Sequence, residues 1–390
     1  MICNQRKNRT KEPSICFFGT YESTFPRSIT LKKACQRINI KVIECHFPFW
    51  EKTREKFEFF TPKSLVLVVF KLFLIYIRLT IHYLFKVKNH DVVIVGYNGY
   101  FDMPLAKLLA KMRRKPVIFT PVFPLYETLV EDRKYISQFS LKSKAIHFVD
   151  ELSCSLADLI IIETNTYLDY YCREFNVPRE KFYKIPLGAD EDNFFPRPIE
   201  TTRKNSCHLN ILFYGKFIPL QGIPYIIKTA KILENDKDIS FEIIGSGQLS
   251  EEINALAQSL HLQNVTFIDW VDYQSLPYHI QKADICLGIF GDTLKARRGI
   301  PIKVYEALAM KKPVITGDSP AAREVFRPNV NAVLCPMANP EALAESILLL
   351  KKDKELRQKI AEAGFRLYQH LFSSSVIAQE FKKVLEKLSS

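Results

Sequence analysis

The stretch that most constrains the fold of this chain runs from Gly299 to Glu324 and has the sequence GIPIKVYEALAMKKPVITGDSPAARE. Its centre has the apolar spacing of a helix with an acid in the first turn, and KPVITGD is typical of a charged turn, a short buried strand and a glycine stop. With the apolar run Ile285 to Phe290 before it, the stretch predicts a strand, a helix and a second, parallel strand. Parallel sheets bind ligands at the carboxyl ends of their strands, where we expect Glu306 to lie.

Glu306 has two interpretations at that edge. A carboxylate just inside a helix can accept two hydrogen bonds from a vicinal diol such as a ribose, and the free backbone N–H groups before it favour phosphate. Alternatively, the acid only complements the helix dipole, as acids in first turns commonly do. The residues around it have to decide between the two.

The length of 390 residues exceeds one ordinary hydrophobic core and suits two domains of α/β size. The nine cysteines form no CxxC pair and no Cys/His cluster, which indicates reduced thiols in a cytosolic protein and argues against a metal site.

The basic charge is confined to one part of the chain. Residues 1–150 hold 26 Lys and Arg against 12 Asp and Glu, a net charge of +14, whereas the other 240 hold 29 against 30, a net charge of −1. A one-sided positive field favours an anionic surface, either nucleic acid or the inner face of a membrane. Because no nucleic-acid-binding motif is present, we expect a cytoplasmic protein that is peripheral on the inner face of the cell membrane and binds no nucleic acid.

The composition and the positions of glycine and proline also predict the domain boundaries. The segments are a basic arm without the apolar core of a signal peptide (1–13), a first Rossmann-like domain (14–193), a proline-containing linker (194–207), a second Rossmann-like domain (208–372) and a final helix (373–390). In the first domain, Gly19 ends a buried strand and would let a ligand approach the backbone, although a lone glycine at a strand end more often reflects plain turn chemistry.

The most apolar stretch is Leu65 to Phe85, and it allows three interpretations. A membrane span is disfavoured, because a charge at the centre of a span costs roughly 2.5 to 3.5 kcal/mol. On a helix, Lys71, Arg78 and His82 fall on one side. That pattern fits either a helix lying in the membrane interface with snorkelling cations or a helix packed in the protein with one wet edge.

A dense polar cluster follows between residues 126 and 135. Its members Glu127, Asp132 and Arg133 are interpreted either as a solvated helix face with internal ion pairs or as part of the acceptor or donor-sugar site.

The second half repeats the order of strand, glycine loop and helix. A buried strand from Leu209 reaches Gly215 and Lys216, and the lysine is placed to neutralise a diphosphate. Gly245, Ser246 and Gly247 stand between a strand and a helix, which is the context that a phosphate or nucleoside loop requires. Trp270 and Val271 come at the end of another predicted strand, where a base could stack or bond to the backbone.

The segments FYGKFIPLQGI, FEIIGSGQ, VTFIDWV, ADICLGIF and IPIKVYEALAMKKPVITGDSPAAREV together resemble the donor-binding half of family 4 of the retaining glycosyltransferases. The closest likeness is to the bacterial "glycosyl transferase group 1" branch with a P-x-K-x-x-E element, here Pro301, Lys303 and Glu306. The likeness spans about residues 14 to 385. It implies a GT-B fold, in which two α/β Rossmann-like domains with parallel sheets face a central cleft and the final helix crosses back to the first domain.

The resemblance also implies a reaction, a sugar transfer with retention from a nucleotide-sugar substrate, without metal or cofactor, to a glycan or lipid-linked acceptor in polysaccharide or glycolipid synthesis. By the matching positions, Lys216 would hold the diphosphate and Glu306 the ribose as the catalytic pair. The implied donor-binding residues are Gly19, Gly215, Gly245, Ser246, Gly247, Trp270, Val271, Arg298 and Lys303. A cation and helix-end N–H groups would stabilise the departing nucleoside diphosphate.

Two positions depart from the family pattern. Gln221 replaces a second basic residue of the diphosphate site, and Arg298 stands where the family has an acid eight residues before Glu306. Arg298, with Lys295 and Arg297, could take over the lost phosphate contact, whereas the missing acid has no obvious replacement. The alternative function is therefore a donor-binding or scaffolding subunit of the same fold that lacks turnover; a sugar-nucleotide epimerase is a lesser option, because it needs acids and a histidine that the sequence does not place.

Overall fold

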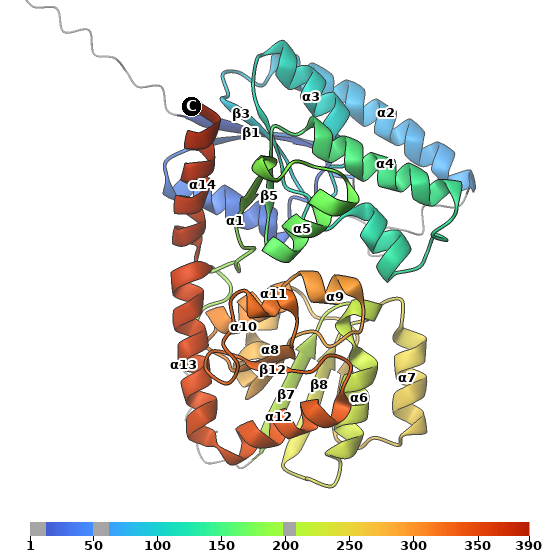
Figure 1. The fold of residues 1–390 in the computed structure, drawn as a ribbon, viewed down its shortest axis with the longest axis vertical. Coiled ribbons are helices and arrows are strands. Elements are labelled where there is room, and N and C mark those ends of the chain that lie inside the picture. Colours follow the sequence, from blue (N-terminus) through green and yellow to red (C-terminus); the bar gives the residue numbers. More distant parts are fainter. Residues whose placement is uncertain (1–12, 50–61, 198–207, 390) are drawn as a thin grey trace, which may run out of the picture.

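The computed structural model describes residues 13–49, 62–197 and 208–389, which form two α/β domains, one above the other (Figure 1). Each domain is built around a parallel six-stranded sheet. The predicted basic arm and most of the predicted linker lie outside the described residues, except that Phe194 is buried and packs its ring 5.3 Å from that of Tyr273. The predicted fold class, two domains with parallel sheets, is confirmed.

The N-terminal sheet has the strand order β2-β1-β3-β4-β5-β6. Its strands are β1 (Ser14–Gly19), β2 (Lys41–His46), β3 (Val92–Val95), β4 (Val117–Phe119), β5 (Leu159–Ile162) and β6 (Phe182–Lys184). The central strands are continuous apolar runs because helices cover both faces of the sheet.

The helices of this domain divide between the two faces. They are α1 (Pro26–Arg37), α2 (Pro62–Phe85), α3 (Met103–Met112), α4 (Leu141–Leu156) and α5 (Asn165–Glu174). The chain steps from β1 to β2 in one direction and then always in the other, so right-handed connections place α1 on one face and α2 to α5 on the opposite face. The two apolar clusters on either side of the sheet follow this division.

The C-terminal sheet has the order β12-β11-β10-β7-β8-β9. Its strands are β7 (Leu209–Tyr214), β8 (Ile239–Ile244), β9 (Val265–Ile268), β10 (Ile285–Leu287), β11 (Val314–Gly317) and β12 (Val333–Cys335). Its helices are α6 (Ile223–Ile232), α7 (Ser250–Ser259), α8 (Leu276–Lys282), α9 (Leu294–Arg298), α10 (Ile302–Ala309), α11 (Pro320–Arg323) and α12 (Pro340–Lys352).

Two last helices run along one side of both domains (Figure 1). α13 (Lys354–Leu371) belongs to the C-terminal domain, and α14 (Ser374–Ser389) packs against α1 of the N-terminal domain, with Phe381 and Leu31 in one buried cluster. At the crossing, Glu191 accepts hydrogen bonds from the hydroxyl of Tyr368 at 3.2 Å and the backbone N–H of Ser374 at 3.0 Å. The first and last chain crossings between the domains are thus bonded to each other.

Candidate active site between the two domains

Glu306 lies in α10, which begins directly after Pro301. Proline favours this position because its fixed φ and missing N–H suit a helix start, and the carboxylate therefore sits in the second turn, not in the first as predicted. The side chain is 3% exposed, and the hydroxyl of Tyr214, at the end of β7, donates to its Oε2 at 2.9 Å. Burial raises the pKa of Glu306 to about 7, although the Tyr214 hydrogen bond and the Lys303 charge act in the opposite direction.

Lys303, one turn before Glu306, reaches the same strand end. Its Nζ donates to Oε1 of Gln221 at 2.6 Å and lies 3.7 Å from the centroid of the Phe213 ring. Burial holds the pKa of this amine well below its usual range. From the sequence, Gln221 leaves the diphosphate site one cation short; in the structure, Lys303 brings an ammonium group to the Gln221 side chain itself.

The predicted glycine loops stack directly on each other at this edge. Gly215, Gly245 and Gly247 have φ values of +147°, +142° and +153°, a region that other residues rarely adopt. A Cβ on Gly245 would lie 2.0 Å from the carbonyl oxygen of Gly215, so only glycine allows this approach. Lys216 follows Gly215 and is exposed, as is Ser246. The result is a surface of backbone with a lysine beside it.

Three other predicted donor residues have different surroundings. Trp270 comes two residues after β9 and is 52% exposed, while Val271 is half-buried against the apolar cluster that contains Tyr214. Gly19, at the end of β1, has a φ of +116°, and a Cβ there would lie 2.3 Å from Oδ2 of Asp102. The close approach at Gly19 is therefore made by a carboxylate of the same domain.

Arg298 crosses to the N-terminal domain. Its Nη1 donates to Oε1 of Glu127 at 2.6 Å and to Oε2 of Glu131 at 3.0 Å, and its guanidinium lies 3.7 Å from the centroid of the Tyr170 ring. Glu127 is fully buried and also accepts a hydrogen bond from Tyr167. The interpretation of Glu127 as part of a solvated helix face is wrong, because α9 covers it.

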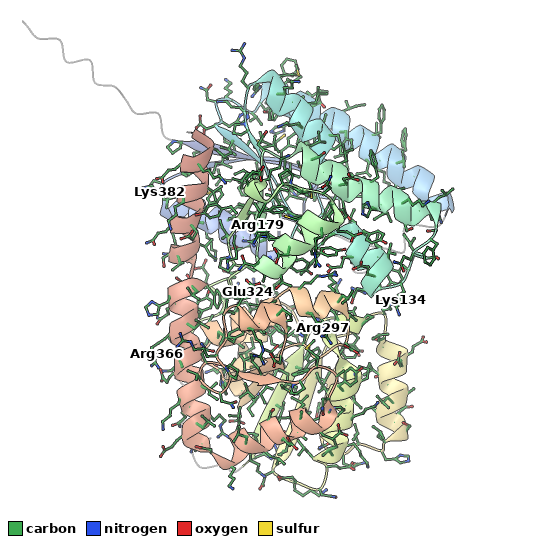
Figure 2. The ribbon with its side chains drawn as sticks, viewed as in Figure 1. Lys134, Arg179, Arg297, Glu324, Arg366 and Lys382 are labelled. Atoms are coloured by element: carbon green, nitrogen blue, oxygen red, sulfur yellow. The ribbon has the colours of Figure 1, made fainter. Side chains whose placement is uncertain are left out.

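The rest of the 126–135 cluster also faces the second domain. Lys295, which is 6% exposed, donates from Nζ to Oγ1 of Thr128 at 2.6 Å. Asp132 is 2% exposed, and burial raises its pKa while the charge of Lys295 lowers it. The backbone oxygen of Arg133 accepts a hydrogen bond from Nε2 of Gln248 at 3.0 Å, next to the glycine loop. Figure 2 shows Lys134 and Arg297 near this boundary between the domains.

Glu163 is a site residue that the sequence prediction missed. It follows β5, is 4% exposed, and neither of its carboxylate oxygens has a hydrogen-bond partner among the described residues. Burial raises its pKa to about 8. A Cβ on Gly299 would lie 2.5 Å from its Oε1, so the carboxylate faces the loop between α9 and α10. An acid directly after a buried strand was the available signal.

A second missed residue holds the domains together. Glu324 of the C-terminal domain, labelled at the boundary in Figure 2, accepts hydrogen bonds at 2.9 Å from the backbone N–H groups of Asn165 and Thr166. These two residues begin α5, where free N–H groups and the helix dipole favour a carboxylate. Since Glu306, Lys303, Glu127 and Glu163 are all buried, a ligand can reach them only after the surrounding side chains move apart.

The comparisons with known proteins agree with this geometry. Residues 199–367, which include Lys216, Lys303 and Glu306, match the family model of the Glycosyl transferases group 1. This part of the chain is a group 1 glycosyltransferase domain. Over nearly its whole length, the chain is similar to the Anabaena protein HepE solved in complex with UDP, with a TM-score of 0.70, 14% identity, and 97% of this chain and 100% of that chain covered. The fold is therefore the GT-B fold.

Curated relatives match shorter parts. An uncharacterized glycosyltransferase of Methanocaldococcus jannaschii is 26% identical over 178 residues, 46% of this chain and 48% of the relative. The phosphatidyl-myo-inositol mannosyltransferase of Mycobacterium leprae is 24% identical over 210 residues, 53% of this chain and 54% of the relative. The chain thus spans about half the length of these relatives.

Proposed function

We propose that the protein is a retaining, metal-independent glycosyltransferase that moves a sugar from a nucleoside-diphosphate sugar to a glycan or lipid-linked acceptor. The observation that carries the proposal is the gathering of Glu306, Lys303 and Lys216 around the end of β7, beside the stacked glycine loops. A carboxylate can hold the ribose diol there, and two lysines can hold the diphosphate.

The chemistry follows from charge. The bond from the anomeric carbon to the donor phosphate oxygen breaks and that carbon bonds to the acceptor hydroxyl oxygen, while the acceptor proton passes to the departing diphosphate, which gains negative charge as the bond breaks. Lys216, Lys303 and the free N–H groups at the start of α10 can stabilise that charge because they are already in place before the reaction. Lys303 is held ready by its hydrogen bond to Gln221.

Glu127 is the candidate replacement for the family acid that Arg298 displaces. The C-terminal domain supplies the cation, Arg298, and the N-terminal domain supplies the carboxylate, Glu127. Nη1 of Arg298 lies 2.6 Å from Oε1 of Glu127. We assign to Glu127 and the nearby Glu163 the contact with the donor sugar hydroxyls, and to Arg298 the positioning of Glu127. Asp132 and Arg133 border the same side.

The printed names of the similar proteins support the substrate classes. HepE was solved with UDP, which favours a nucleotide-sugar donor. The M. leprae relative is named for a lipid acceptor, which favours glycolipid synthesis.

The direct test is release of nucleoside diphosphate from a panel of uridine and guanosine diphosphate sugars. Lys216→Ala and Glu306→Gln should each lower the release rate about 100-fold or more, because each removes a charge that acts on the donor. Lys228→Ala on α6 and Glu345→Ala on α12 are matched controls, since both side chains are exposed, and they should keep full activity. Full activity in both site variants would reject the site assignment.

The same experiment separates the enzyme from the subunit without turnover. The latter would show a rise in melting temperature with UDP or GDP, because a ligand of the native state stabilises it, yet release no product from any donor.

A pH series tests Glu306 specifically. Since burial raises its pKa to about 7, the diol-binding carboxylate is lost below that pH, and nucleotide binding should tighten as the pH rises from about 6 to about 8. The Glu306→Gln variant should bind weakly and show no such pH dependence; an unchanged pH profile in the variant would exclude this role.

A further inference from the structure

One side of α2 is exposed and almost entirely apolar. The segment Leu67–Phe85 has a mean hydropathy of 1.8, and only 11% of it is buried. Its exposed large apolar side chains are Leu67, Val69, Phe70, Phe73, Leu74, Ile77, Ile81, Leu84 and Phe85. The interpretation of this helix as a packed helix with a wet edge is therefore wrong, because the edge left open is the apolar one.

The opposite side of α2 is fixed to the domain. Leu79 and Tyr83 are fully buried, and the Tyr83 hydroxyl lies 2.8 Å from Nε2 of His90. Arg113, directly after α3, donates from Nη2 to the backbone oxygens of Tyr83 at 2.8 Å and Leu84 at 2.9 Å. Because one side of α2 is buried in the domain, lipid cannot surround the helix. Only the exposed side of α2 can lie against another surface.

The apolar surface continues onto the neighbouring helices. α3 packs between α2 and α4, and all three lie on the same face of the sheet (Figure 1), so their outer sides face one direction. Leu108 and Met112 on α3 and Leu141 and Phe148 on α4 are 59–84% exposed, as is Phe139 at 88% just before α4. We call the outer sides of α2, α3 and α4, with Phe139, the apolar face.

Cations accompany the apolar face. Lys71 and Arg78, seven residues apart and hence on one side of α2, are exposed at its edge, and Lys142 and Lys144 are exposed on α4. Residues 62–115 hold ten Lys and Arg against two Asp and Glu. Long basic side chains beside an apolar helix are arranged to reach lipid headgroups while the apolar groups enter the acyl boundary.

We infer that the apolar face docks the protein on an anionic lipid bilayer, with α2 lying in the interface. The charge pattern decides against a second copy of this chain, because a symmetric pair would set the same cations against each other. Anionic headgroups complement them instead. The inference does not depend on the proposed chemistry, since it uses none of the residues of the candidate active site.

The orientation has a consequence for the acceptor. In a parallel α/β domain, helices run opposite to the strands, so the N-terminal ends of α2 and α4 lie at the carboxyl edge of the sheet, where the candidate active site is. Phe139 and Leu141 stand at that end of α4. A docked molecule would hold its active site next to the membrane surface, within reach of the headgroup of a lipid-linked acceptor.

Co-sedimentation with vesicles tests the docking. The full chain should bind vesicles of phosphatidylcholine with about one third phosphatidylglycerol, bind pure phosphatidylcholine at least about tenfold less, and lose most of its binding between about 0.1 M and about 1 M salt. Equal binding to both kinds of vesicle would overturn the inference.

Variants separate insertion from simple attraction. The triple change Phe70→Gln, Phe73→Gln and Ile77→Gln should weaken binding at least about tenfold while all cations remain. Lys71→Gln with Arg78→Gln should weaken it about fivefold per cation and flatten the salt dependence. The matched control is Ile232→Gln, Leu348→Gln and Leu349→Gln, three exposed apolar residues of the C-terminal domain, which should bind as the unchanged protein does.

Two outcomes would reject the proposal. One is unchanged vesicle binding by the α2 triple variant with an unchanged melting temperature. The other is a stable dimer by light scattering that the α2 triple variant converts to a monomer, which would show that a second copy covers the apolar face.

Discussion

The two domains contribute different groups to the candidate site. The C-terminal domain contributes cations and glycine backbone beside Glu306, with Lys303 next to Gly215 and Arg298 on α9, whereas the N-terminal domain contributes buried acids, Glu127 and Glu163. The part of the site in the C-terminal domain is assembled from short stretches around one sheet edge. The part in the N-terminal domain depends on side chains that become neighbours of the C-terminal domain only when the domains pack. The difference shows that residues near one strand end can be brought together by local sequence, whereas Glu127 and Arg298 become neighbours only when the two domains pack.

The largest effect is expected from Lys303→Met, which removes one cation of the C-terminal domain. Product release should fall about 100-fold or more. Stability should fall only modestly, because methionine leaves Gln221 without its hydrogen bond, a loss of about 1–3 kcal/mol, but also removes the cost of a buried amine whose pKa is lowered by burial. Release kinetics and thermal melting on one preparation give both quantities. A parallel loss of melting temperature and activity would reduce Lys303 to a structural residue.

Glu127→Gln removes one of the two buried acids that the N-terminal domain contributes. Arg298 and Lys295 would then face a neutral amide, and loss of one member of a buried ion pair destabilises by about 3 kcal/mol. Urea unfolding measures the change. The control is Glu131→Gln, since the Glu131 side chain also bonds Arg298 but is 24% exposed, and it should cost less than about 1 kcal/mol. Equal effects of the two variants would contradict the special place of Glu127.

Glu163→Gln tests the second buried acid of the N-terminal domain through the pH dependence of the unfolding free energy. Because its pKa is raised to about 8 in the folded state, from about 4 in the unfolded chain, its contribution to stability is complete below about pH 4 and disappears as the pH rises through about 8. Replacement by glutamine should remove a negative slope of up to about 1.4 kcal/mol per pH unit from the unfolding free energy in that window. Identical slopes with and without Glu163 would show that this carboxyl ionises normally.

The smallest effect is expected from the edge of the boundary. Arg133→Ala removes contacts of 3.4 Å to Gln248 and 3.8 Å to Asp132, while the bond from Gln248 to the backbone of residue 133 remains. We expect a change of about 1 kcal/mol or less in urea unfolding, because both contacts are long. A loss of several kcal/mol would mean that the outer edge, not the Arg298 pair, joins the domains.

The alternation of apolar strands, glycine stops and helices was sufficient to predict the fold from the sequence, because each signal lies within about ten residues. The positions of Lys216 and Glu306 near the end of β7 could be predicted for the same reason, because each residue belongs to a local element. The start of α10 was misplaced by one turn, since Pro301 marks it more reliably than the apolar spacing does.

What the sequence did not reveal depends on distance along the chain. Gln221 seemed to leave the diphosphate site deficient, yet Lys303, 82 residues later, bonds to it. Arg298 seemed to remove an acid, yet it bonds to an acid of the other domain, Glu127, 171 residues earlier. The apolar side of α2 was visible as a pattern, but helical spacing does not say which side the protein covers.

The bonded chain crossings at Glu191 limit how the two domains can separate. Two crossings tied at one point behave as a pivot, so the lobes swing apart rather than slide. The contacts farthest from that pivot, on the side of α7 in Figure 1, travel the most and break first. A labelled pair placed across Arg133 and Gln248 would therefore report the opening stroke at its greatest amplitude, while a pair beside Ser374 would scarcely move.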